Sequence, residues 1–189
     1  MIRKRNLTLA KQLWRFTGLV AIILTWIVIV ASVYQNPWFN VFKHALSDLG
    51  APKANLPWIY NIGLVIVGSI ICIYSLYLAY IAINKLYVFS FALMFIAGIF
   101  LALIGLFPSS TKPHGFVSLW FFVQIWLSLV STAISMIKDR KIIYSLIMWI
   151  IVVIGPLGAI LIKWPSVAIL EIYGVILIDI YVAILTINF

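Results

Sequence analysis

Charged residues are scarce in this sequence of 189 residues. Only 9% are Asp, Glu, Lys or Arg, and only four are acidic. Soluble domains carry about 25% charged residues, so the composition excludes an ordinary soluble protein. Cysteine occurs once, as Cys72, which excludes a disulfide within the chain. We interpret Cys72 as a small buried apolar residue.

Long apolar runs are what the sequence has in place of charge. Apolar residues make up 66% of the chain, in runs almost free of charge. A run of roughly 18 or more such residues crosses the hydrocarbon core of a bilayer as a helix. The sequence therefore predicts an all-α integral membrane protein, with residues 1–189 as a single membrane domain that forms a six-helix transmembrane bundle. The expected spans are about 16–33, 58–83, 86–107, 116–137, 142–162 and 167–187.

Lysine and arginine are divided unevenly between the two sides of this predicted bundle. If the N-terminus is inside, nine of them lie on the inner side and four on the outer side. Cytoplasmic segments carry such an excess, so we expect a cell-membrane protein with both termini in the cytoplasm. The inner set is Arg3, Lys4, Arg5, Lys11, Arg15, Lys85, Lys138, Arg140 and Lys141, and the outer set is Lys43, Lys53, Lys112 and Lys163.

The net charge of +9 follows from the same arrangement, because basic ends face anionic lipid headgroups. Nucleic-acid binding would need a basic face interleaved with polar contacts, and the sequence has none. The expected partners are therefore the lipid bilayer and other membrane subunits, and no nucleic acid.

The longest predicted loop, residues 35–57, carries signals of a short helix. Asn36 and Pro37 are suited to the cap and the first position of a helix, and Gly50 followed by Pro52 is suited to its end. We therefore expect a short interfacial helix between the first two spans. Its apolar stripe would consist of Trp38, Phe39, Val41, Phe42, Ala45, Leu46 and Leu49.

On that helix His44 and Asp48 are four residues apart and would share one face, with Ser47 beside them. A carboxylate–imidazole pair of this kind orients a catalytic histidine or binds a metal. The alternative is a local hydrogen bond that fixes the helix.

The second histidine, His114, lies in the polar stretch 107–115, which leads into the fourth span. Pro113 and Gly115 flank it and constrain the backbone. In a six-span bundle this stretch emerges on the same side as His44, so the two histidines would lie at one end. The alternative is an interfacial histidine without a partner.

The last predicted span contains two carboxylates, Glu171 and Asp179. Carboxylates within a span face the bundle interior and indicate function by default. Glu171 would join the two histidines at the outer end. Asp179, about 12 Å further along the helix, is expected to bond Asn61, Gln124 or Ser69. The alternative for both is a protonated acid that makes hydrogen bonds between helices.

Two stretches resemble a known family. The sequence Ser47-Asp48-Leu49-Gly50 follows the first span, and Phe107-Pro108 with His114 follows the third. This order resembles the prokaryotic six-helix membrane family catalogued as domain of unknown function 998. The resemblance implies a fold and no established activity.

A looser similarity exists to the intramembrane hydrolases that include alkaline ceramidases and progestin-type receptors. Those seven-helix proteins hold zinc with three histidines beside a serine and an aspartate. This chain offers His44, His114, Ser47 and Asp48, but it lacks a third histidine and a seventh span. Glu171 would have to replace one ligand.

Three functions fit these observations. The first is a non-catalytic or assembly subunit, in which the outer His/Asp/Glu cluster is a structural clasp. The scarcity of polar residues within the spans favours it. The second is a metal-dependent intramembrane hydrolase or lipid-modifying enzyme, with His44, Asp48, His114 and Glu171 around a divalent metal such as zinc. Metal-bound water would be the nucleophile, with Ser47 at the oxyanion, or His44 and Asp48 would form a general base.

The third function is redox. His44 and His114 would ligate one haem, or a quinone would bind at the same end of the bundle.

Overall fold

The structure is a computed structural model that describes residues 13–189. Arg3, Lys4, Arg5 and Lys11, which the charge argument uses, lie outside the described residues. Six long helices occur in the described part of the chain, and each is long and apolar enough to cross a membrane. They are α2 (Thr17–Gln35), α3 (Trp58–Ile81), α4 (Lys85–Leu106), α5 (His114–Lys138), α6 (Ile142–Leu161) and α7 (Val167–Asn188).

Two short 3₁₀ helices complete the secondary structure of residues 13–189. The first, η1 (Trp14–Phe16), leads into α2, and the second, η2 (Leu46–Gly50), lies in the loop between α2 and α3. The predicted all-α fold with six spans is confirmed, and the predicted boundaries agree with the helices to within a few residues. Hydrocarbon offers no partner for backbone N–H and C=O groups, and a helix satisfies them within itself.

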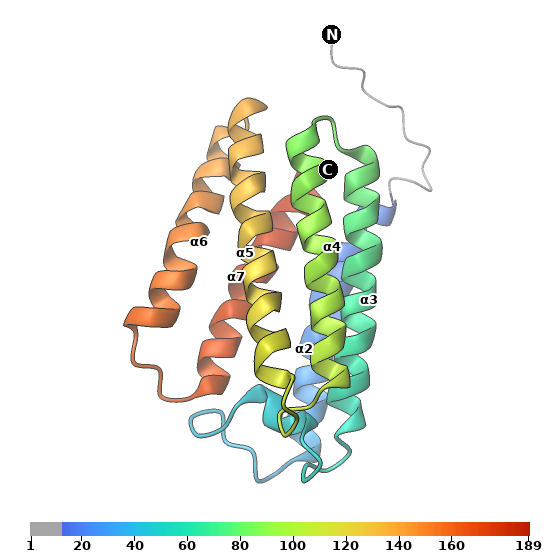
Figure 1. Cartoon of the computed structure of the whole chain (residues 1–189), viewed down its shortest axis with the longest axis vertical. Helices are drawn as coiled ribbons and strands as arrows, with labels where there is room; N and C mark the ends of the chain where they lie inside the picture. The colour runs from blue at the N-terminus through green and yellow to red at the C-terminus, as the bar shows by residue number, and fades with distance from the viewer. Residues whose placement is uncertain (1–12) are drawn as a thin grey trace.

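Helices that follow one another in the sequence pack side by side, from α2 to α6 (Figure 1). The last helix, α7, contacts α2, α6 and α5 and so completes the bundle. The C-terminus lies at the upper end in Figure 1. The loops 36–57, 107–113 and 162–166 gather at the lower end, which we call the loop end. The two histidine-containing stretches therefore emerge at the same end, as the sequence predicts.

The closest helix pair is α3 and α4, and glycines allow the approach. A Cβ atom added at Gly68 would lie 2.5 Å from the carbonyl oxygen of Gly98, and one added at Gly98 would lie 2.9 Å from the carbonyl oxygen of Gly68. Small residues let the backbones of membrane helices pack this closely.

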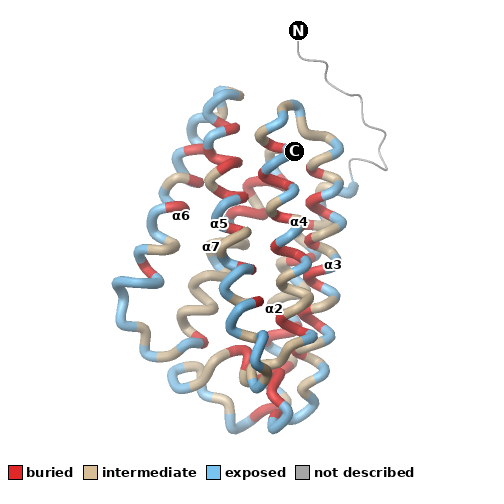
Figure 2. The backbone as a smooth tube through the Cα atoms, in the orientation of Figure 1, coloured by how far each residue is buried: buried red, intermediate tan, exposed pale blue. Residues whose placement is uncertain are grey.

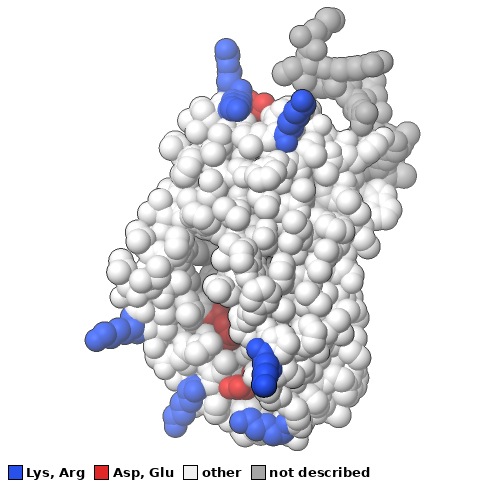
Figure 3. All heavy atoms as spheres, in the orientation of Figure 1, with Lys and Arg blue, Asp and Glu red and all other residues white. Residues whose placement is uncertain are grey.

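Buried residues line the interior of the bundle, while exposed residues cover its sides (Figure 2). On the face seen in Figure 3, Lys and Arg lie near the two ends and the wide middle zone is almost free of charge. That distribution suits a bilayer around the middle zone.

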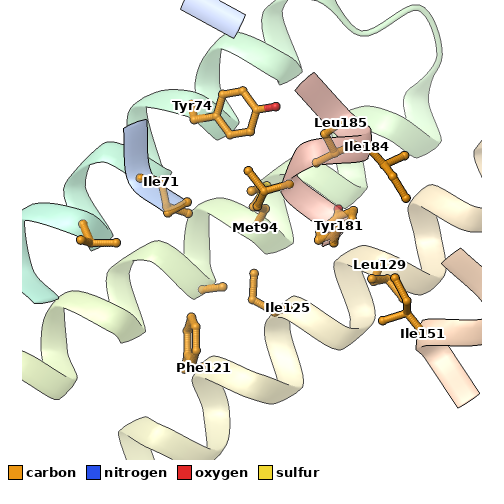
Figure 4. Packing of buried hydrophobic residues seen from close by; sticks show 14 of the residues in the cluster. Ile71, Tyr74, Met94, Phe121, Ile125, Leu129, Ile151, Tyr181, Ile184 and Leu185 are labelled. Atoms are coloured by element: carbon orange, nitrogen blue, oxygen red, sulfur yellow. The ribbon is translucent and has the colours of Figure 1, made fainter. Parts of the chain in front are cut away.

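The core is built from side chains of α3 to α7 that point toward one another (Figure 4). Tyr74, Met94, Tyr181 and Leu185 are fully buried there. The helix α6 contributes least: 22% of its most apolar stretch is buried, against 44% for α3 and α5.

The loop between α2 and α3 differs from the prediction. Instead of an amphipathic α-helix that begins at Asn36, the segment forms turns followed by the five-residue η2. Polar side chains bond the backbone locally: Asn40 Oδ1 accepts from the N–H of Phe42, and His44 Nδ1 accepts from the N–H of Asn40. Such bonds compete with a continuous helix.

Candidate functional site: a clasp at the loop end

The loop between α2 and α3 is fastened to α7 by hydrogen bonds that run in both directions. Glu171 Oε2 accepts a hydrogen bond of 2.6 Å from the N–H of Leu46, the first residue of η2. In return, the N–H of Ala168 in the first turn of α7 donates to the carbonyl of His44 at 2.9 Å. Each segment therefore satisfies an unpaired N–H at the helix start of the other.

A third bond extends this arrangement. Ser166 caps α7 by accepting from the N–H of Ile169 at 3.1 Å, and its hydroxyl donates to the carbonyl of Val41. We call this set the loop clasp. Its members are Val41, His44, Leu46, Ser166, Ala168 and Glu171.

His44 and Asp48, which the sequence suggests as a pair, each bond a backbone N–H group. Asp48 Oδ2 accepts a hydrogen bond of 3.0 Å from the N–H of Ala45, the residue before η2. Asp48 is the third residue of η2, where an acidic side chain commonly reaches back to the backbone in this way. Ser47 is buried in the same short helix. The catalytic trio proposed from the sequence therefore lies close in the chain, but its carboxylate and imidazole bond the backbone.

The imidazole of His44 is held by both ring contacts and a hydrogen bond. Its ring centroid lies 5.2 Å from that of Trp38 and 5.7 Å from that of Phe39. Its Nδ1 accepts a 2.9 Å hydrogen bond from the N–H of Asn40, so Nδ1 carries no proton. A metal-bound histidine usually donates its second ring N–H to an acceptor. His44 has the opposite arrangement, which is unsuited to a metal ligand.

His114 lies at the first position of α5, and its Nδ1 is a hydrogen-bond donor, whereas Nδ1 of His44 is an acceptor. Nδ1 of His114 lies 2.8 Å from the carbonyl oxygen of Phe107, so Nδ1–H donates to that oxygen. This contact joins His114 to the first residue of the polar stretch 107–115 that the sequence analysis singled out. His114 therefore closes the turn between α4 and α5.

The predicted metal set of His44, Asp48, His114 and Glu171 receives no support. Within residues 13–189, no group of three or more His, Cys, Asp or Glu side chains is placed to hold a metal ion. Two of the predicted ligands, Asp48 and Glu171, instead bond neighbouring N–H groups at the start of η2.

The base of the loop is closed by Asn36, which is 1% exposed. Its Nδ2 donates to the carbonyls of Ser32 and Asn55. Its Oδ1 accepts from Trp38 Nε1 at 2.9 Å and from the N–H of Asn55 at 2.7 Å. Asn36 therefore joins the first and last turns of the loop, which explains why it does not begin a helix.

Comparison with known proteins identifies a family. The family model described as "Protein of unknown function (DUF998)" matches residues 19–188. The chain belongs to this family. No curated protein and no solved structure matches it. The family membership confirms the resemblance drawn from the Ser47–Gly50 and Phe107–His114 stretches, whereas the similarity to ceramidases stays a prediction.

Within this DUF998 protein, Asp179 has a partner that the sequence analysis did not name. Trp26 Nε1 in α2 donates to Asp179 Oδ2 at 2.8 Å. Two of the expected partners have other bonds: Asn61 Nδ2 donates to the carbonyl of Gly50, and Ser69 donates to that of Val65. The Asp179 bond links α7 to α2 across the bundle.

A buried hydroxyl cluster in this DUF998 protein also escaped the sequence analysis. Ser128 Oγ lies 2.7 Å and Thr132 Oγ1 2.9 Å from the hydroxyl of Tyr181, and Ser90 bonds both Ser128 and Thr132. The signal was present in α5, where Ser128, Thr132 and Ser135 are spaced to share one helix face. The cluster joins α4, α5 and α7.

Proposed function

We propose that this DUF998 chain is a non-catalytic membrane subunit that acts by assembly with another membrane protein, and that its polar cluster is a structural clasp. The observation that carries the proposal is the 2.6 Å hydrogen bond between Glu171 and the N–H of Leu46. It uses the carboxylate nearest the loop to hold backbone. An enzyme would need another residue of the chain as its catalytic carboxylate or metal ligand.

The other candidate side chains support the same proposal. His44 and Asp48 each accept from a backbone N–H, and His114 donates to a carbonyl. These bonds orient the loops at the loop end. Side-chain bonds to backbone of this kind are typical of turns and helix caps, and they account for these residues without a reaction.

The surface of α6 supports the assembly role. Along α6, six apolar side chains spaced alternately by three and four residues are between 49% and 78% exposed. They are Ile143, Leu146, Ile150, Val153, Leu157 and Ile160. This spacing forms the seam through which two helices pack with a small crossing angle, in membranes as in coiled coils.

The occupant we propose for this seam is a transmembrane helix of another protein. Because α6 buries less of its surface within the bundle than α3, α4 or α5, it has more apolar surface left for a further helix to cover. We also propose that both termini face the cytoplasm, which places the loop clasp on the outer side of the cell membrane.

Site-specific photo-crosslinking in native membranes tests the assembly role. A benzophenone amino acid at Ile150, in the seam, is compared with one at Ile66, a lipid-exposed position of α3 that is 46% exposed. We expect a discrete adduct of higher mass from position 150 that is absent from position 66. Equal labelling from the two positions, or only lipid adducts from both, would contradict the proposal.

The orientation has its own test. In a Cys72→Ser background, Lys112→Cys at the loop end and Lys138→Cys at the other end are labelled with a membrane-impermeant maleimide on intact cells. We expect labelling at position 112 and protection at position 138. The reverse pattern would show that the loop clasp faces the cytoplasm.

A further inference from the structure

A cavity of about 110 Å³ lies inside the bundle between α2, α3, α4, α5 and α7. Figure 3 shows the front face of the molecule hollowed, with carboxylate atoms recessed below the surface. The cavity is lined by Leu46 and Ser47 of η2 at the loop end, and by Asp179 and Val182 of α7 at its other extreme. It therefore extends from the clasp into the membrane-spanning part of the bundle.

Two buried residues of the cavity wall, Tyr60 and Ser47, carry hydroxyl groups. Tyr60 is 7% exposed and Ser47 is 8% exposed. Both residues line the cavity, so a group within it would be a partner for their hydroxyls.

The same wall carries both intramembrane carboxylates. Glu171 bonds Leu46 through Oε2, and Asp179 bonds Trp26 through Oδ2. The second oxygen of each carboxylate makes no hydrogen bond within the described residues. Tyr60 stands close to η2, because a Cβ added at Gly50 would lie 3.0 Å from the Tyr60 ring. Glu171, Tyr60 and Ser47 therefore form a polar region at the loop end of the cavity.

The charge of the lining selects the ligand. Two carboxylates line the cavity, whereas none of its lining residues, all within the described range, is Lys, Arg or His. With these carboxylates ionised, such a site favours a cation and disfavours a phosphate. Most of the remaining wall is aliphatic or aromatic, with Leu64, Met94, Ile125 and Val182 among its members. An alkyl chain matches that surface.

We propose that this cavity binds a phosphate-free alkylamine from the bilayer. The protonated amino group has three N–H donors, and it would donate to Glu171, Tyr60 and Ser47. The alkyl chain would lie along the apolar wall. This inference goes beyond the assembly role, because the clasp is complete without a ligand.

The test uses full-length protein in phosphatidylcholine nanodiscs. Thermal unfolding is followed over a concentration series of n-hexylamine and of n-hexanol, which has the same chain without the charge. A ligand that binds only the folded state raises the midpoint with its concentration, and the series yields an apparent Kd. We expect hexylamine to raise the midpoint of the wild type far more than hexanol.

Variants locate the site. Glu171→Gln removes the negative charge that would pair with the amine, so we expect hexylamine affinity to fall at least about tenfold. Tyr60→Phe should weaken it by a smaller factor. Asp48→Asn is the matched control, because Asp48 is a carboxylate at the same end that does not line the cavity. Its affinity for hexylamine should fall by a smaller factor than that of Glu171→Gln, because the charge of Asp48 acts on the site from outside the cavity.

Several results would overturn the proposal. They are equal shifts with hexylamine and hexanol, no shift with hexylamine, or unchanged affinity in Glu171→Gln. If Glu171→Gln does not fold, two measurements still test the proposal. They are the comparison of hexylamine with hexanol in the wild type and the hexylamine affinity of Tyr60→Phe. A further experiment uses nanodiscs that contain phosphatidylethanolamine, a lipid whose amino group is linked to a phosphate. We expect the same hexylamine affinity as in phosphatidylcholine. A lower affinity would mean that this lipid competes for the cavity, and the proposal that the ligand carries no phosphate would be wrong. None of these readouts depends on the α6 seam, so each proposal stands or fails separately.

Discussion

Glu171 and Leu46 are 125 residues apart in the sequence, yet the carboxylate of one accepts a 2.6 Å hydrogen bond from the backbone N–H of the other. The bond joins the last helix of the bundle to the first loop. Because Glu171 is a carboxylate within a predicted span, the sequence suggests chemistry there. The structure gives it a clear structural partner.

Replacing Glu171 measures what this bond contributes to stability. Glu171→Ala leaves the N–H of Leu46, a buried residue, without its partner, which costs about 1–3 kcal/mol. Glu171→Gln keeps an acceptor oxygen and should cost less. Thermal unfolding in nanodiscs should therefore rank wild type above Gln and Gln above Ala. A Gln variant as unstable as the Ala variant would mean that the charge, rather than the acceptor, matters.

Asn36→Ala should loosen the loop at its base. The substitution removes one side chain that makes four hydrogen bonds, so we expect a loss of roughly 2 kcal/mol or more. Limited proteolysis should cut within residues 36–57 faster than in the wild type. Asn40→Ala, which removes a single bond at an exposed site, is the control and should change the rate little. Equal cleavage of the two variants would contradict the role of Asn36.

Metal analysis separates the clasp from a metal centre. We expect purified wild type and the His44→Ala/His114→Ala variant to contain the same background level of zinc. The physical reason is that His44 Nδ1 already accepts a backbone N–H. Near one equivalent of zinc in the wild type, lost in the variant, would overturn the non-catalytic role.

The buried hydroxyl cluster should show coupling between its members. Tyr181→Phe removes a hydroxyl that contacts Ser128 and Thr132, and bonds between membrane helices contribute about 0.6 kcal/mol on average. In a double-mutant cycle, Tyr181→Phe with Ser128→Ala should cost less than the sum of the single changes, because they share one interaction. Strict additivity of the unfolding free energies would show that the two hydroxyls do not interact.

Two glycine substitutions test the close approach of α3 and α4. Gly68→Ala places a Cβ 2.5 Å from the carbonyl oxygen of Gly98, so the helices must separate and stability should fall. Gly155→Ala in α6 meets only Leu177 Cδ1 at 3.6 Å, an ordinary contact. It should be neutral or slightly stabilising, because alanine favours a helix over glycine. Equal thermal midpoints for the two variants would contradict the close packing at Gly68.

The spans were predictable from the sequence because one physical rule dominates them. A long apolar run in hydrocarbon has to be a helix, so the length and position of α3 or α5 follow from composition. The grouping of His44 and His114 at one end follows from counting spans.

The loop was not predictable by the same means. Asn36 and Pro37 carry helix-start signals, but Asn36 bonds Asn55 across the loop, a contact set by tertiary structure. Likewise, the spacing of His44 and Asp48 suits a pair only on a regular helix, and the turns there remove that geometry. Glu171 was placed correctly near the loop end, whereas its N–H partner has no sequence signature.

The loop clasp also sets an order of events during synthesis. The loop leaves the translation machinery early, behind α2, whereas Ser166, Ala168 and Glu171 belong to the final helix hairpin. The carbonyls of Val41 and His44 and the N–H of Leu46 therefore gain these partners only after the start of α7 has been synthesised. The bonds that fasten the first loop to α7 are consequently formed later than the bonds within the loop itself.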